Sequence, residues 1–204
     1  MFIFGCSHAA ILAAEVFYRA GGLALINPIF APGLTPDVRP ITRTTEIERM
    51  EGYGRVILNT SPVKPGDVLV VHSVSGRNGV PVEMAIEAKA LGVTVIALTS
   101  VEYAKSVSSR HSSGLRLHEV AHIVLDNCGL PGDAVVDVPG LGQRTGPTSD
   151  LVGAAILHSV VAQVIGNLIA EGLTPPVFVS ANLEGGDEHN ERILAEYGDR
   201  IHYL

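Results

Sequence analysis

The stretch VVHSVSGRNGVP, residues 70–81, decides the fold of this chain. An apolar strand over residues 68–73 runs into the loop Ser73-Val74-Ser75-Gly76-Arg77-Asn78, and a helix over 79–92 begins at once. The strand is apolar on both faces, as central strands of parallel sheets are. The stretch therefore predicts a strand–loop–helix unit of an α/β protein.

The same alternation of strand and helix continues along the chain. We expect strands at 2–5, 23–27, 68–73, 93–100 and 122–127, and helices at 9–22, 44–58, 79–92, 115–121, 151–173 and 187–197. Residues 176–183 resemble a further strand, and the Gly/Pro-rich residues 129–147 are expected to pack over a functional face. This pattern predicts one α/β domain over residues 1–204. Its expected architecture is a three-layer αβα sandwich with a five-stranded parallel sheet in the flavodoxin-like order 2-1-3-4-5.

In such a sheet, ligands bind outside the carboxyl ends of the strands, where the strand order reverses. The reversal is expected between the first and third strands. Their exit loops are Gly5-Cys6-Ser7-His8 and Ser73 to Asn78. These two loops therefore form the expected ligand crevice.

The second of these loops has the composition of a phosphate cradle. A helix start offers unpaired N–H groups and a partial positive charge, and Gly76 allows an anion to approach the backbone. Ser73, Ser75 and Asn78 add hydroxyl and amide donors, while Arg77 adds a full charge. The alternative is an Asn N-cap preceded by turn-forming Ser and Gly residues.

Composition and charge exclude several classes of partner. Hydrophobic residues make up 47% of the 204 residues, charged residues 17%, and the formal net charge is −7. Because no dense Lys/Arg cluster occurs, we expect neither nucleic acid nor an anionic membrane as a partner. Residues 151–173 are long enough to span a bilayer, but three polar residues interrupt them: His158, Gln163 and Asn167. We therefore predict a buried core or interface helix.

Cofactors, metals and a secreted disulfide framework are not expected. The two cysteines, Cys6 and Cys128, lack metal-type spacing and are too few for a disulfide framework, which indicates a reducing, cytoplasmic setting. His8, Glu188 and His189 also lack metal-type spacing. No dinucleotide or nucleoside triphosphate motif occurs.

The loop SVSGRN, residues 73–78, resembles the Ser-x-Ser-Gly-x-Thr loop of the SIS (sugar isomerase) phosphosugar-binding domain. The blocks that extend the resemblance over nearly the whole chain are FGCSHAAILAAEVFYRAGG (4–22), ERMEGYG (48–54), SGRNGVPVEMA (75–85), ALTS (97–100), SSRHSSG (108–114), GPTS (146–149), PPVFVSAN (175–182) and GGDEHN (185–190). Together they resemble a bacterial family of stand-alone SIS proteins. The resemblance implies a Rossmann-like sandwich and a phosphorylated sugar as ligand. It places Ser73, Ser75 and Asn78 at the phosphate.

The chain departs from the SIS pattern in two places. Ala9 stands where a serine is expected in the first loop, so that Ser7 or His8 has to compensate. The helices that usually precede the first strand of SIS domains are also missing from the pattern.

The resemblance further implies an acid–base pair. Glu15 resembles the helix glutamate that acts as base in sedoheptulose-7-phosphate isomerases of this superfamily, and His158 resembles the helix histidine of those enzymes. The alternatives are that Glu15 pairs with Arg19 at i+4 and that His158 is a core or interface histidine.

Two further loops hold candidate ligand contacts. His111 shares a polar loop after the fourth strand with Arg110 and Ser113, and we expect this loop to face the crevice. Thr148 and Ser149 precede the long helix, where we expect them to cap it and to contact substrate.

The resemblance implies an aldose–ketose phosphosugar isomerase, an intramolecular oxidoreductase that uses a carboxylate and a histidine as an acid–base pair. Such an enzyme needs a base that moves a proton between C1 and C2 and a group that helps to open the ring. The alternatives are a phosphosugar lyase similar to N-acetylmuramic acid 6-phosphate etherases, a non-catalytic phosphosugar sensor, and a structural subunit without a ligand. The long apolar helix and the missing front helices predict a homodimer or larger assembly.

Overall fold

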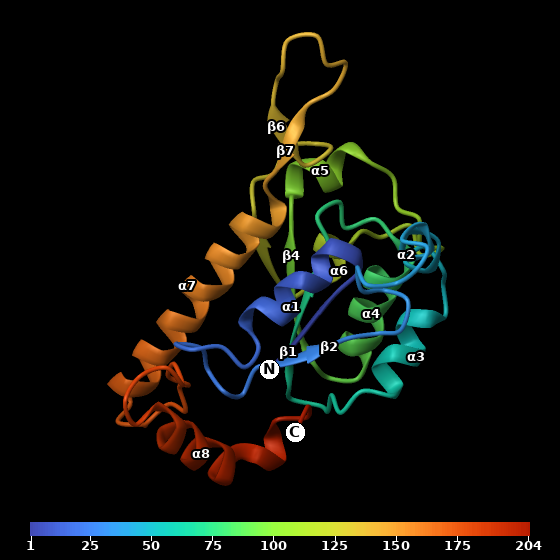
Figure 1. Ribbon diagram of the computed structural model, residues 1–204. Coiled ribbons are helices and arrows are strands. Elements are labelled where there is room, and N and C mark those ends of the chain that lie inside the picture. The colour runs from blue at the N-terminus through green and yellow to red at the C-terminus, as the bar shows by residue number, and fades with distance from the viewer.

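The computed structural model describes residues 1–204 and contains a five-stranded, all-parallel sheet (Figure 1). Its strands are β1 (Phe2–Gly5), β2 (Asn27–Ile29), β3 (Val68–His72), β4 (Thr94–Thr99) and β5 (Ile123–Asp126). They lie in the order β2-β1-β3-β4-β5. The predicted fold class and the predicted strand order are confirmed.

Helices cover both faces of the sheet (Figure 1). One face carries α3 (Tyr53–Asn59), α4 (Gly79–Ala90) and α6 (Leu117–Val120), with α2 (Thr42–Ile47) beside them. The other face carries the 3-10 turn η1 (Ser7–Ala10), α1 (Ile11–Val16) and α7 (Ser149–Ala170). The remaining helices are α5 (Val101–Ser106), α8 (Gly186–Tyr197) and the 3-10 turn η2 (Gly198–Arg200).

Alternating side chains of the central strands supply the two cores. Phe4 and Val71 are fully buried in the cluster beneath α4, while Ile3 and Val70 are buried with Leu12 of α1 in the cluster on the opposite face. Because successive side chains of a strand point to opposite faces, these buried strands are apolar throughout.

The first predicted helix is shorter than expected. It was predicted over residues 9–22, but α1 ends at Val16, and Phe17 takes extended dihedral angles. Phe17 and Tyr18 instead join an aromatic cluster with the C-terminal part of the chain, since Phe17 packs on Tyr203 and Tyr18 on Phe178. Tertiary packing therefore overrides the helical periodicity.

The second strand lies later in the chain than predicted. Residues 23–27 were expected to form it, whereas β2 comprises Asn27–Ile29 and includes Pro28. Proline lacks an amide donor, and the edge position of β2 tolerates this loss. Leu23 instead forms an isolated antiparallel bridge with Val177, which is the only strand-like pairing in the predicted strand 176–183.

The helix predicted over 44–58 is broken into α2 and α3. Gly52 has a φ of +91° in the turn between them. This turn lies on the start of α4, where the Val80 amide donates to the Glu48 carbonyl at 3.0 Å. A Cβ on Gly79 would lie 2.8 Å from the Arg49 carbonyl oxygen, so a glycine is needed for this approach. The break brings Glu48 to the carboxyl edge of the sheet.

Residues 129–147, which were expected to pack over a functional face, contain a hairpin. Its strands β6 (Ala134–Val136) and β7 (Thr145–Pro147) are antiparallel, and the hairpin projects beyond the carboxyl edge of the sheet (Figure 1). Its tip, residues 137–143, is exposed. Helix α5 was not predicted either; the Ser100 hydroxyl caps it by accepting from the Tyr103 amide at 3.0 Å.

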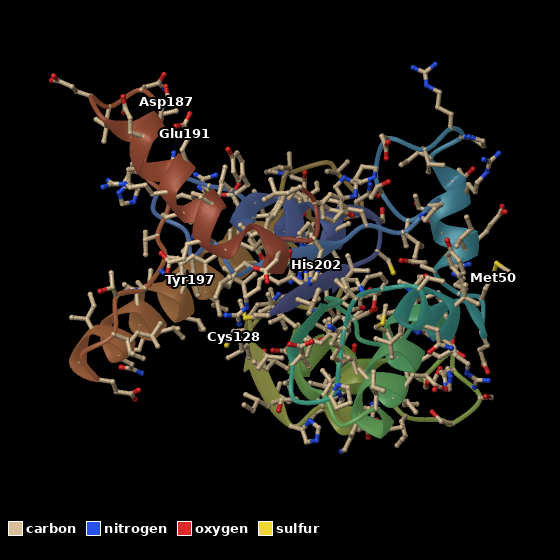
Figure 2. The ribbon with its side chains drawn as sticks, turned by 90° about the horizontal axis from the view of Figure 1, so that it is seen from below. Met50, Cys128, Asp187, Glu191, Tyr197 and His202 are labelled. Carbon is tan, nitrogen blue, oxygen red and sulfur yellow. The ribbon has the colours of Figure 1, made fainter.

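Helix α7 is long and apolar enough to cross a membrane by length and composition alone. One stripe of it is buried: Gly153, Leu157 and Val161 pack toward α1 and the sheet. The rest exposes apolar side chains, among them Ile169 at 60%. Seen from below, α7 and α8 extend from one side of the sheet body, with Asp187 at the far end of α8 and His202 near the sheet (Figure 2). Of the predicted core or interface helix, the core part is confirmed for one stripe, while an interface on the exposed side stays a prediction.

Candidate functional site

A crevice of about 650 Å³ opens at the carboxyl edge of the sheet, where the strand order reverses between β1 and β3. Its lining residues come from the ends and exit loops of β1 and β3, the α2–α3 turn, α5, the base of the β6–β7 hairpin and the start of α7. They are Cys6, Ser7, His8, Ala9, Glu48, His72, Ser73, Val74, Ser75, Asn78, Tyr103, Asp133, Pro147, Ser149, Asp150 and Leu151. Both exit loops named from the sequence thus line one crevice.

A second hollow of about 640 Å³ lies between β2, α3 and the C-terminal residues His202 and Tyr203. Its lining contains no carboxylate, lysine or arginine, and it lies outside the reversal of strand order. The polar crevice at β1 and β3 is therefore the candidate site.

The loop from Ser73 to Asn78 presents unpaired donors. The amides of Ser75, Arg77 and Asn78 donate no hydrogen bond within the chain. Gly76 turns the loop at a φ of +58°, and a Cβ there would lie 3.2 Å from both Thr99 Oγ1 and Leu117 Cβ. The Ser73 and Ser75 side chains are partly exposed and line the crevice. The loop therefore offers amides and hydroxyls to an anion.

Asn78 precedes α4 without capping it through its side chain, because the side-chain amide group is already hydrogen-bonded elsewhere. Its Nδ2 donates to Glu48 Oε1 at 2.7 Å, and its Oδ1 accepts from Arg110 Nη1 at 2.7 Å. Burial raises the pKa of Glu48, while the charges of Arg49 and Arg110 oppose that shift. The Asn78 side chain thus organises the loop, and its backbone amide remains available.

The two predicted arginines flank the loop rather than line the crevice. Arg77 Nη2 donates to Ser108 Oγ at 3.1 Å, and the Arg77 carbonyl accepts from the Arg110 amide at 2.7 Å. Burial lowers the pKa of Arg110, and the charges of Arg77 and Arg49 lower it further. The three guanidinium groups create a positive field behind the loop.

The β1 exit loop folds sharply back over its own strand. A Cβ on Gly5 would lie 2.3 Å from the Ala9 carbonyl oxygen, so this turn requires glycine. Ser7 has a φ of +56° and donates its amide to Leu34 at 2.7 Å. Ser7 and the exposed His8 both line the crevice, as does Ala9. Burial raises the pKa of the Cys6 thiol well above its usual range, so this thiol stays neutral.

Three residues that were not expected from the sequence line the crevice outside its two exit loops and are called its wall below: His72, Asp133 and Asp150. His72 is fully buried, its Nδ1 lies 3.2 Å from the Ala9 carbonyl oxygen, and its Nε2 has no partner. Burial lowers the pKa of His72 to about 4. The imidazole is therefore neutral at pH 7. Because the Ala9 carbonyl oxygen can only accept a hydrogen bond, the ring proton is on Nδ1, which donates to that carbonyl. The unprotonated Nε2 is then a hydrogen-bond acceptor.

The two aspartates of this wall differ in how their oxygens are used. Asp133 accepts from the amides of Thr148 and Ser149 at 3.3 and 2.9 Å, and from the Ser149 hydroxyl at 2.6 Å. Asp133 therefore caps α7, whereas Thr148 and Ser149 were expected to do so. Asp150 Oδ1 is buried without a partner. Burial raises the pKa of Asp150, while the nearby His8 lowers it.

Glu15 and His158 meet each other but do not line the crevice. Glu15 Oε1 lies 3.3 Å from His158 Nε2 and 2.9 Å from Arg19 Nη1. The pair sits between α1 and α7, and both side chains are partly exposed. The sequence thus correctly indicated Arg19 as a partner of Glu15, while the expected position of Glu15 in the crevice is not observed.

His111 and Ser113 lie in a loop that is hydrogen-bonded to the α2–α3 turn. His111 Nδ1 is 2.9 Å from Ser113 Oγ, and Glu51 accepts from the Ser112 amide at 2.6 Å. Neither His111 nor Ser113 lines the crevice. This loop contributes to the site through Arg110, which holds Asn78.

Comparison with known proteins places the chain in a family. The SIS domain family model matches residues 1–100. UPF0309 proteins match over the full 204 residues: one from Shouchella clausii is 56% identical, and one from Oceanobacillus iheyensis is 50% identical, each matched over 83% of its own length. One from Streptomyces griseus is 45% identical, with 81% of its length matched.

The chain belongs to the UPF0309 family. Its SIS domain indicates phosphosugar binding and confirms the resemblance carried by SVSGRN. The SIS match includes β1, β3 and the loop from Ser73 to Asn78, whereas Asp133 and Asp150 lie beyond it. The UPF0309 crevice thus combines an SIS half with a second half from the hairpin base and the start of α7.

Proposed function

We propose that this UPF0309 protein binds a phosphorylated sugar in the crevice between β1 and β3, with the phosphate on the loop from Ser73 to Asn78. The observation that carries the proposal is the set of unpaired amides at the start of α4. Helix starts with free amides bind phosphate because the N–H groups and the helix dipole both favour negative charge. The Ser73 and Ser75 hydroxyls add donors from the same side.

The charges around the loop support this orientation. Arg77 belongs to the loop, and its charge and that of Arg49 lower the pKa of the nearby Arg110. Outside the loop the crevice lining carries the carboxylates Asp133, Asp150 and Glu48, of which Glu48 is hydrogen-bonded to Asn78 of the loop. A phosphate is therefore attracted to the loop and repelled by the wall, which orients the sugar toward Asp150.

We further propose that the protein converts its ligand as an aldose–ketose phosphosugar isomerase. Such an enzyme needs a base that moves a proton between C1 and C2 and a second group that helps to open the sugar ring, and a carboxylate and a histidine suffice for these roles. Glu15 and His158 form such a pair at 3.3 Å, with His111 as a further candidate. Because neither Glu15 nor His158 lines the crevice of its own chain, the proposal requires a second copy to bring the pair to a crevice.

The assembly and setting form part of the same proposal. The exposed apolar side of α7 fits a homodimer or larger homo-oligomer. A cytoplasmic setting, without nucleic acid, membrane or cofactor as partner, fits the net charge of −7 and the free cysteines Cys6 and Cys128. A phosphosugar lyase and a non-catalytic sensor would use the same phosphate loop, and turnover assays separate them from the isomerase.

Calorimetry with inorganic phosphate, glucose 6-phosphate and unphosphorylated glucose tests the proposed phosphate site. We expect the two phosphates to bind and glucose not to bind. Ser75→Ala should weaken both phosphates by about 3- to 10-fold, since one hydrogen bond contributes roughly 1 kcal/mol. Ser159→Ala is the matched control, because Ser159 lies on the exposed part of α7 and its hydroxyl bonds only within that helix. Equal loss in both variants, or no binding of phosphate, would reject this site.

A further inference from the structure

The wall of the crevice, outside the phosphate loop, has a chemistry of its own. It contains two buried acceptor atoms without donors, His72 Nε2 and Asp150 Oδ1. Buried acceptors are normally paired, since an unpaired one retains the cost of its lost hydration. Both residues line the crevice, so a molecule occupying it is in position to supply the missing donors.

His72 is the stronger of these two observations. Its side chain is fully buried at the end of β3, directly before Ser73, and its Nδ1 is fixed against the Ala9 carbonyl at 3.2 Å. This contact fixes the ring and leaves Nε2 as an acceptor. A hydroxyl or amino group of a ligand supplies the donor that Nε2 lacks.

Negative charge is the second property of this wall. Asp133 lies close enough to Asp150 for its charge to raise the pKa of Asp150. Glu48 lines the crevice as well. Nearby cations are His8, when it is protonated, and the arginines behind the phosphate loop. A carboxylate on the sugar end of a ligand would therefore meet like charge.

We propose that His72 and Asp150 form a specificity wall that selects a phosphosugar rich in hydrogen-bond donors and rejects one bearing a carboxylate. This inference rests on the proposed function, because it takes the phosphate to lie on the loop from Ser73 to Asn78. The ligand is then a neutral polyhydroxyl sugar phosphate or an amino sugar phosphate. The wall also opposes an etherase-like reaction on muramic acid, because the lactyl ether of that sugar carries a carboxylate.

Inorganic phosphate and three phosphorylated six-carbon compounds test the wall by calorimetry on the full chain: glucose 6-phosphate, glucosamine 6-phosphate and 6-phosphogluconate. Glucose 6-phosphate and glucosamine 6-phosphate should bind more tightly than phosphate. The compound 6-phosphogluconate should bind at least about tenfold more weakly than glucose 6-phosphate, because juxtaposed like charges are costly. This charge effect does not depend on which epimer the natural ligand is. If glucosamine 6-phosphate binds more tightly than glucose 6-phosphate, the ligand is an amino sugar phosphate. If glucose 6-phosphate binds more tightly, the ligand is a neutral polyhydroxyl sugar phosphate.

Asp150→Asn should remove most of the discrimination against 6-phosphogluconate, and it should not weaken inorganic phosphate, because it removes a negative charge from the crevice. Asp137→Asn is the matched control, since Asp137 lies at the exposed tip of the hairpin and pairs only with Arg144. His72→Leu, a second variant that removes the acceptor, should weaken glucose 6-phosphate but not inorganic phosphate. Because His72 is buried, circular dichroism checks that the His72→Leu variant folds. If this variant does not fold, Asp150→Asn alone tests the specificity wall.

The outcomes separate the two proposals. If phosphate binds but 6-phosphogluconate matches glucose 6-phosphate, or if Asp150→Asn leaves their ratio unchanged, the specificity wall is wrong while the proposed function stands. If no phosphorylated probe binds, the proposed function fails and the wall fails with it. Loss of phosphate affinity in Asp150→Asn would also overturn the wall, because it would assign Asp150 to the anion site or to folding.

Discussion

The Asp133 carboxylate caps helix α7 through Ser149, accepting the amide of that residue at 2.9 Å and its hydroxyl at 2.6 Å. Asp133 sits at the base of the hairpin with a φ of +63°, a left-handed conformation that aspartate tolerates better than most residues. One side chain thus joins the hairpin, the start of α7 and the crevice.

Loss of this cap should destabilise the protein. We expect Asp133→Ala to lower the free energy of unfolding by about 1–2 kcal/mol, which is typical of a lost N-cap. Urea denaturation followed by circular dichroism measures the change. Asp137→Ala, at the hairpin tip, should change it by less than about 0.5 kcal/mol. Similar values for the two variants would show that the cap contributes nothing.

Gly76 is the residue on which the shape of the phosphate loop depends. Gly76→Ala places a methyl group 3.2 Å from Thr99 Oγ1 and Leu117 Cβ, at a φ of +58°. The strain should cost about 1–2 kcal/mol of stability and weaken inorganic phosphate by at least about tenfold, since the loop amides would be displaced. Gly114→Ala, at a φ of +72° with open space around it, is the matched control for the dihedral strain alone. Retained phosphate affinity in Gly76→Ala would remove the loop from the binding site.

The sheet could be predicted from the sequence because its signals are local. Apolar runs such as residues 68–72 and the glycine at position 5 mark strands and their ends. The strand order then places the crevice between the β1 and β3 loops, and the structure confirms that order. The crevice lining includes Ser7, His8, Ser73, Ser75, Asn78 and Ser149 from the set of expected contacts.

The other half of the crevice depends on contacts between distant segments. Glu48 reaches it because the chain breaks at Gly52 to pack against Gly79, and a helical period over 44–58 conceals that break. His72 is the last residue of an apolar strand, where a histidine resembles a core residue. Asp133 lies in a Gly/Pro-rich segment without periodicity. The one usable signal was the position of His72 directly before Ser73, at the end of a strand where ligands bind.

His72 should make stability depend on pH in a defined window. Its folded pKa of about 4 lies below the unfolded value of about 6.5, so the unfolded chain takes up the proton first as the pH falls. The contribution of His72 to the free energy of unfolding is present above pH 6.5 and is lost progressively as the pH falls toward 4. Between pH 7 and pH 5 the loss should be about 2 kcal/mol. The neighbouring Asp133 charge favours the protonated ring and is already included in this folded pKa.

Urea denaturation at pH 7 and pH 5, compared between wild type and His72→Leu, isolates this contribution. The variant should lose less stability than the wild type over this interval, because it lacks the titrating group. Equal losses would show that His72 is accessible to protons in the folded state, which would contradict its burial.

The exposed apolar side of α7 predicts self-association. Light scattering at micromolar concentration should give at least twice the monomer mass of 21.4 kDa. Val164→Glu and Ile169→Glu should each shift the mass toward the monomer, because a charge placed in an apolar interface is costly. Leu183→Glu is the control, since Leu183 is 62% exposed but lies outside α7. A monomeric wild type would reject the assembly.

The last prediction concerns the proton transfer itself. Glu15 is 2.9 Å from Arg19 and 3.3 Å from His158. If Glu15 is the base, Glu15→Gln should lower kcat by about 10²- to 10⁴-fold with little change in KM, because the amide keeps the shape and loses the proton acceptor. The assay follows aldose–ketose conversion by NMR with whichever sugar phosphate calorimetry selects.

Arg19→Gln is the control for the ion pair, because it leaves the carboxylate in place. Equal loss of kcat in both variants would make Glu15 a structural residue. Full activity of Glu15→Gln, together with loss in Asp150→Asn, would move proton transfer from the α1–α7 pair to the wall of the crevice.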